Sequence, residues 1–134
     1  MMIDPKSIKK IAQKYNLSLI YLFGSKAIKK DSKLSDTDIA VLPKDGVKKD
    51  RKDLVLDLIF EFSQLFHSDK IDLLVLEGSS LSIQYNVISE GKLLYANNPD
   101  VRSDYETRII KLYLDFKKFE EEYYENMRKS IRER

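Results

Sequence analysis

The pattern of apolar and polar positions divides this chain into helices and strands in mixed order. Leu17–Phe23 is a compact apolar run that stops at Gly24, which indicates a buried strand. The same criteria predict strands at 37–42, 71–76 and 93–95, and helical spacing predicts helices at 5–15, 49–67, 81–90 and 100–134. This order predicts an α/β (α+β) fold in which a small mixed sheet of about four strands is flanked by helices.

The length of 134 residues suits one domain. We expect a core over residues 1–97 and a C-terminal helical extension over 98–134 that packs on the same domain. The extension is charged but rich in aromatic side chains, and it is longer than so small a sheet can cover. Its aromatic positions fit two interpretations: packing within the domain, or contact with a partner or with a second copy of the chain in a homo-oligomer.

Composition narrows the classes of function. A formal net charge of +2 argues against a protein that binds nucleic acid mainly through bulk charge. The chain has no cysteine, which excludes disulfides, zinc–thiolate sites and thiol nucleophiles. No apolar run approaches the roughly 20 residues that cross a bilayer, and the start lacks the apolar stretch of a signal peptide. We therefore expect a soluble, cytoplasmic protein without a membrane partner.

Paired carboxylates mark the start of the second predicted strand. Asp36 and Asp38 are two residues apart, and side chains at that spacing point from one face of a strand. Asp72 leads the third predicted strand in the same way, and it lies beside the pair if the two strands are neighbours. Carboxylate oxygens suit Mg²⁺, and three carboxylates can hold two ions in the arrangement used for displacement at phosphorus.

A Gly-Ser pair follows the first predicted strand. At this position Gly24 lets the backbone approach a phosphate, and the Ser25 hydroxyl with exposed N–H groups can bind the phosphate oxygens. Lys26 or Lys29 can add a positive charge there. The alternative is structural: Asp36 only caps a turn, Asp38 only faces solvent, and Asp72 only marks the start of a strand.

The spacing of these residues resembles the signature of the polymerase-β-like nucleotidyltransferases. The chain has Gly24-Ser25, then ten residues, then Asp36-Thr37-Asp38. The size of the chain is similar to that of the minimal nucleotidyltransferase (MNT) branch, and the resemblance runs over most of the chain.

The resemblance implies a role for each of these residues. Ser25 would contact the triphosphate of the nucleotide, and Asp36 and Asp38 would bind Mg²⁺. Asp72 would ligate metal and help to activate the acceptor. Many MNT proteins are antitoxins that silence a HEPN-domain ribonuclease toxin by transferring AMP from ATP to a tyrosine of the toxin. The resemblance therefore implies this activity, a HEPN toxin as partner, ATP as substrate and two Mg²⁺ ions as cofactors.

One segment departs from the family pattern. Family members often continue the Gly-Ser pair with an arginine and a further glycine, whereas this chain has Lys26-Ala27-Ile28-Lys29. Lysine supplies charge but lacks the planar fork of arginine. Two other functions stay open: nucleotidyl transfer to a small molecule or an RNA end, and a non-catalytic antitoxin that acts by binding alone. The intact aspartates favour catalysis, and the altered segment favours binding.

Overall fold

The computed structural model describes residues 3–24, 36–44 and 50–133. It confirms the predicted α/β architecture, with a four-stranded mixed sheet and a long C-terminal helix. The main shift in a boundary is that the helix predicted at 49–67 begins at Arg51, after the capping residue Asp50. In chain order the elements are α1 (Pro5–Lys14), β1 (Leu17–Phe23), β2 (Thr37–Pro43), α2 (Arg51–Phe66), β3 (Ile71–Val75), α3 (Leu81–Glu90), β4 (Lys92–Ala96) and α4 (Pro99–Arg132).

Capping residues set the starts of the helices. The Asp4 carboxylate accepts a hydrogen bond of 3.0 Å from the Lys6 N–H, and Pro5 occupies the first helical position. Ser80 caps α3 and Asn98 caps α4 in the same way. Each helix therefore starts at a residue that its local sequence specifies.

The strand order in the sheet is β3-β2-β1-β4. β1 is antiparallel to both of its neighbours, whereas β2 and β3 are parallel. The continuous apolar run of β1 is buried along almost its whole length, as expected for a central strand covered on both faces. The starts of β2 and β3 and the end of β1 meet at one edge of the sheet. That edge carries the predicted carboxylates and Gly24.

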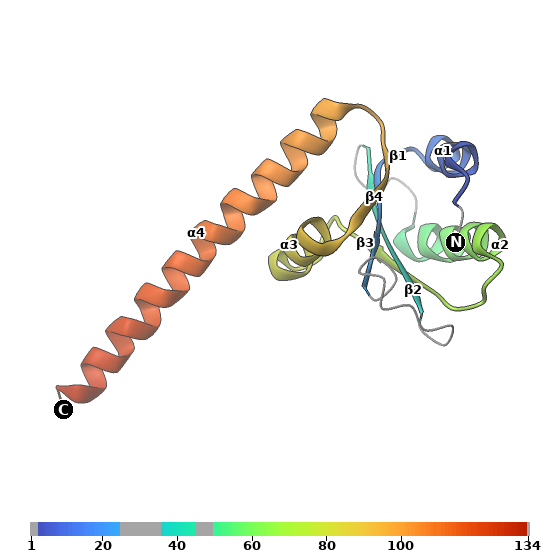
Figure 1. Cartoon of the computed structure of the whole chain (residues 1–134). Helices are drawn as coiled ribbons and strands as arrows, with labels where there is room; N and C mark the ends of the chain where they lie inside the picture. Colours follow the sequence, from blue (N-terminus) through green and yellow to red (C-terminus); the bar gives the residue numbers. More distant parts are fainter. Residues whose placement is uncertain (1–2, 25–35, 45–49, 134) are drawn as a thin grey trace.

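Helices cover both faces of the sheet (Figure 1). α1 and α2 lie on one face, and α3 and α4 lie on the other. Alternate side chains of the strands enter the two cores, so each strand contributes to both. The core under α3 and α4 consists of Leu19, Tyr21, Ala40, Leu76, Val87, Tyr105 and Ile109.

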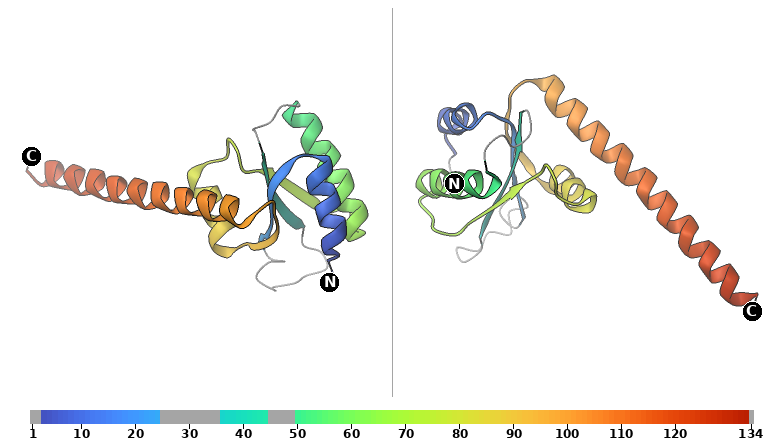
Figure 2. Two further views of the ribbon diagram at one scale, coloured as in Figure 1. Left: turned by 90° about the horizontal axis from the view of Figure 1, so that it is seen from above. Right: turned by 180° about the vertical axis from the view of Figure 1, so that it is seen from behind.

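α4 has two segments with different surroundings. In the proximal segment (residues 99–113), Tyr105 and Ile109 are buried against the sheet. At its end, the ring of Tyr113 stacks on the ring of Tyr85 from α3, with 3.9 Å between the ring centroids. The distal segment (residues 114–132) then leaves the domain, as Figures 1 and 2 show. A helical segment of this length measures roughly 30 Å.

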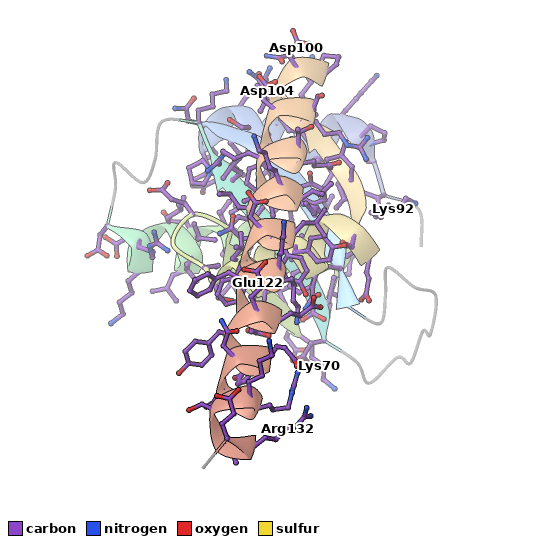
Figure 3. All side chains as sticks on the ribbon, turned by 90° about the vertical axis from the view of Figure 1, so that its left-hand side faces the viewer. Lys70, Lys92, Asp100, Asp104, Glu122 and Arg132 are labelled. Atoms are coloured by element: carbon purple, nitrogen blue, oxygen red, sulfur yellow. The ribbon has the colours of Figure 1, made fainter. Side chains whose placement is uncertain are left out.

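The distal segment carries an apolar stripe that no part of the described chain covers. Its side chains follow the helical face of Tyr105 and Ile109 at spacings of three or four residues. Figure 3 shows α4 from Asp100 to Arg132 in front of the sheet, with side chains projecting along its whole length. Among the helices that the structure describes, none is long and apolar enough to cross a membrane. The apolar stripe consists of Phe116, Phe119, Tyr123, Met127 and Ile131, which are 41–66% exposed.

Candidate active site

The predicted carboxylates of β2 and β3 lie on the face of the sheet that α3 and α4 cover. Because alternate residues of a strand point to opposite faces, Asp38 shares a face with Ala40, and Asp72 shares a face with Leu74. Ala40 belongs to the core under α3 and α4, and Leu74 packs against that core. Both aspartates therefore point to the α3 side, at the edge where their strands begin.

Asp38 and Asp72 are direct partners in the register of β2 and β3. Their carboxyl groups lie within hydrogen-bonding reach of each other. The pKa of Asp38 is raised, first by burial and then by the negative charge of Asp72. Two carboxylates in such positions repel each other unless a proton or a cation lies between them. The pair is therefore suited to binding a positive charge.

Asp36 lies just before β2 and is exposed to solvent. Its charge makes the smallest contribution to the raised pKa of Asp38. Within the described ranges, no three His, Cys, Asp or Glu side chains are gathered closely enough to hold a metal ion by themselves. The structure thus brings two of the three predicted carboxylates together and leaves the third at the approach to β2.

Gly24 lies directly beside the carboxylate of Asp38. Its φ is +75°, a backbone conformation that favours glycine, and a Cβ here would collide with Asp38 Oδ2. The register explains the contact, because Phe23 pairs with Asp38 and the next residue passes close to the carboxylate. The sequence predicted a glycine that approaches a phosphate. The structure adds that a side chain at this position would displace Asp38.

The other predicted phosphate-binding residues, Ser25 and Lys26 or Lys29, lie outside the described residues. Gly24 is the last described residue before this stretch.

A pocket that sequence reasoning missed opens beside Gly24. Its α3 residues recur at spacings of three and four, so they share one face of the helix. The same spacing is typical of core residues, but the Ile83 side chain is 44% exposed, so it forms a wall of the pocket instead. The pocket has a volume of about 230 Å³ and is lined by Phe23, Gly24, Ile83, Asn86, Val87 and Glu90.

Contacts with α4 fix the position of α3. The Tyr105 hydroxyl donates a hydrogen bond of 2.7 Å to Gln84 Oε1. Gln84 Nε2 in turn donates a hydrogen bond of 2.8 Å to the backbone carbonyl of Ser79. Together with the stacked rings of Tyr85 and Tyr113, these bonds join α3 to the proximal segment of α4. The wall of the pocket is therefore held by tertiary contacts.

A comparison with known protein families identifies the family of this chain. The family model described as "Polymerase beta, Nucleotidyltransferase" matches residues 6–100, which is most of the chain. No curated protein matches it.

Solved toxin–antitoxin complexes contain chains of similar structure. In a crystal structure of a toxin–antitoxin with AMP-PNP, the similar chain is 25% identical with a TM-score of 0.71, and the match covers 92% of this chain and 98% of that one. The similar chain of the toxin–antitoxin MntA–HepT is 25% identical with a TM-score of 0.64, covering 92% and 95%. A complex of the tri-AMPylated Shewanella oneidensis HEPN toxin with its MNT antitoxin gives 23% identity, a TM-score of 0.66 and coverage of 92% and 94%, which shows a common fold.

The family match includes the whole sheet and the edge at which its carboxylates meet. It confirms the resemblance that the spacing of Gly24-Ser25 and Asp36-Thr37-Asp38 indicated. This chain therefore belongs to the polymerase β family of nucleotidyltransferases.

Proposed function

We propose that this protein is an antitoxin that transfers AMP from ATP to a tyrosine hydroxyl of a HEPN ribonuclease toxin, in a reaction that depends on Mg²⁺. The observation that carries the proposal is the pairing of Asp38 with Asp72 beside Gly24, on one face of the sheet. Two solved complexes support the nucleotide and the partner, since one contains AMP-PNP and the other joins MntA to HepT.

In the proposed reaction, the tyrosine oxygen attacks the α-phosphorus of ATP. The bond from that phosphorus to the oxygen bridging to the β-phosphate breaks, and pyrophosphate leaves with that oxygen. The hydroxyl proton passes to a carboxylate base. We assign this role to Asp72, because its side chain is exposed where Asp38 is half-buried, so an incoming hydroxyl can reach it. Transfer at phosphorus otherwise depends mainly on positioning and charge neutralisation.

The chemistry of the donor set fits Mg²⁺. This ion typically takes one or two carboxylates and completes its shell with water and phosphate oxygens, and Asp38 and Asp72 supply that number. Asp36 precedes Asp38 by two residues, just before β2. We propose it as a further ligand of the ion. Bound to these carboxylates, Mg²⁺ would neutralise the charge that develops on the phosphate oxygens. We assign the outer phosphates to Gly24 and to the Ser25 and Lys26 that follow it.

We assign the apolar stripe of the distal segment to contact with the toxin. A contiguous exposed apolar surface is typical of protein interfaces, and aromatic side chains are enriched there. The similarity to the toxin–antitoxin complex with AMP-PNP supports this assignment. The uncovered 8% of this chain, about 11 of its 134 residues, is shorter than the distal segment, so the match includes part of that segment.

Labelled ATP tests the proposed transfer. The protein is incubated with Mg²⁺, α-labelled ATP and the product of the neighbouring gene, and label is then sought on a tyrosine of that product. We expect label with the natural chain and none with Asp36→Asn or Asp38→Asn. Asp53→Asn is the matched control, because this carboxylate lies on α2 at the opposite face of the sheet. Label that persists in Asp38→Asn would overturn the assignment of the site.

The same experiment separates the two alternatives. A contact-only antitoxin would inhibit its partner without labelling it, and the length of the exposed apolar stripe favours this function as the second candidate. A nucleotidyltransferase for another acceptor would consume ATP when given a small hydroxyl compound or an RNA end, and would leave the protein partner unlabelled.

A further inference from the structure

We propose that the pocket beside Gly24 receives the base of the nucleotide substrate, and that Asn86 of α3 recognises the edge of that base. The inference rests on the proposed function and adds to it a residue that determines nucleotide specificity.

The pocket adjoins the carboxylates. Gly24 belongs to both sites, since it lies against the Asp38 carboxylate and also lines the pocket. Phe23, the register partner of Asp38, forms the neighbouring wall. Only the ribose separates the base of a nucleotide from its α-phosphate. A nucleotide whose α-phosphate lies at Asp38 can therefore place its base in this pocket.

The lining of the pocket suits a base and not a phosphate. Phe23, Ile83 and Val87 provide apolar walls, against which the flat face of a base can stack. Among the lining residues that the structure describes, the polar groups are the Asn86 amide and the Glu90 carboxylate, and no side chain is cationic. Because Glu90 is negative, it repels phosphate oxygens but accepts hydrogen bonds from an amino group.

The Asn86 amide is available for such recognition. Over the ranges that the structure describes, the side chains of Asn86 and Glu90 make no hydrogen bond or ion pair. An amide presents a donor and an acceptor side by side, which matches the amino group and the ring nitrogen on the edge of adenine. Guanine presents an oxygen acceptor in place of that amino group, so Asn86 with Glu90 favours adenine over guanine.

The pocket is formed by elements that are held in place. A Cβ at Gly91 would collide with the carbonyl oxygen of Val87 and would lie 3.2 Å from that of Leu22, so the absence of a side chain lets the end of α3 approach β1 closely. Tyr105 and the stacked tyrosines hold α3 from the α4 side. A pocket formed in advance loses little conformational entropy on binding a ligand.

Two variants of α3 test the pocket by direct binding. Ile83→Trp fills it, and Ser82→Trp adds the same ring at an exposed neighbouring position that does not line it. Calorimetry with Mg²⁺ compares ATP with inorganic tripolyphosphate, which lacks a base. We expect Ile83→Trp to weaken ATP binding about tenfold, to leave tripolyphosphate binding unchanged, and Ser82→Trp to change neither.

Asn86→Leu tests recognition of the base edge. We expect the preference for ATP over GTP to fall about tenfold, through the KM for the nucleotide and not through kcat, with partial recovery in Asn86→Gln. The pocket assignment is overturned if Ile83→Trp binds ATP as the natural chain does, or if it weakens ATP and tripolyphosphate equally. It is also overturned if the natural chain binds ATP no better than tripolyphosphate, even when transfer occurs. If the natural chain binds neither compound, the proposed function falls as well.

Discussion

The two segments of α4 have the same periodicity but different surroundings. In the proximal segment the apolar face is buried, and Ile109 is 2% exposed. In the distal segment the same face continues, and Ile131 is 61% exposed. Surface ion pairs such as Arg128–Glu125, at 2.9 Å, support the distal turns, and each is worth only about 0.3–0.5 kcal/mol.

An apolar stripe on a helix therefore predicts a contact but does not identify what the helix contacts. The proximal segment packs on the sheet and on α3, and it holds the wall of the pocket beside Gly24 in place. The distal segment has no such support in the described structure, and a single helix of about 20 residues is only marginally stable in water. We expect the two segments to respond differently to matched substitutions.

The largest expected difference concerns stability. Ile109→Ala should lower the free energy of unfolding by about 3 kcal/mol, because it leaves a cavity in the core. Ile131→Ala should lower it by less than about 0.5 kcal/mol, because the side chain is exposed. Chemical denaturation followed by circular dichroism measures both. Equal losses would show that the distal stripe is packed in the free protein, and would remove the distinction between the segments.

The reverse order is expected for binding to the proposed toxin partner. A double substitution, Phe119→Ala with Tyr123→Ala, should weaken binding to the partner about 30-fold, or about 2 kcal/mol, because aromatic side chains dominate interface energies. Calorimetry on purified partners gives the constant. Leu114→Ala is the control, since Leu114 is 56% exposed but lies on the opposite side of α4 from Tyr123. If the control weakens binding as much, the stripe is not the contact surface.

A pair of tyrosine substitutions tests whether the proximal segment supports the proposed nucleotide site. Tyr105→Phe removes the hydroxyl that donates to Gln84, so we expect a loss of about 1 kcal/mol in stability and a raised KM for ATP. Tyr123→Phe should change neither. Thermal unfolding and steady-state kinetics measure the two effects. An unchanged KM in Tyr105→Phe would show that α3 keeps its position without this bond.

The smallest expected effect concerns the part of the sheet face where Asp38 and Asp72 meet. Asp38→Asn should raise the melting temperature at neutral pH, without Mg²⁺, by roughly 2–5 °C, because the ionised Asp38 carboxylate is disfavoured in the fold. The pKa of Asp38 is raised in the folded state, so its penalty is present above that pKa and fades as the pH falls through it. Calorimetric scans over a pH series test this sign. A gain that grows toward acid pH would contradict it.

Much of this fold could be predicted because local patterns specify it. The continuous apolar run of β1 and the caps at Asp4 and Ser80 mark their elements without help from the rest of the chain. The alignment of Asp38 with Asp72 was a condition on strand neighbours, and the parallel pairing of β2 with β3 meets it.

Other features depend on tertiary arrangement and could not be read from spacing. Ile83 fits a buried stripe equally well, and only the approach of α3 to β1 makes it a pocket wall. The contact of Gly24 with Asp38 follows from the antiparallel register of β1 and β2. The length of α4 was predicted, but the point at which it leaves the domain depends on how far the sheet and α3 extend.

The exposed stripe also has a practical consequence for handling the protein. Without a partner, the chain exposes an apolar stripe about five helical turns long to water. Its solubility is therefore limited by aggregation through this stripe more than by unfolding. Co-expression with the partner, or storage at low concentration, should therefore improve recovery more than any substitution that strengthens the core.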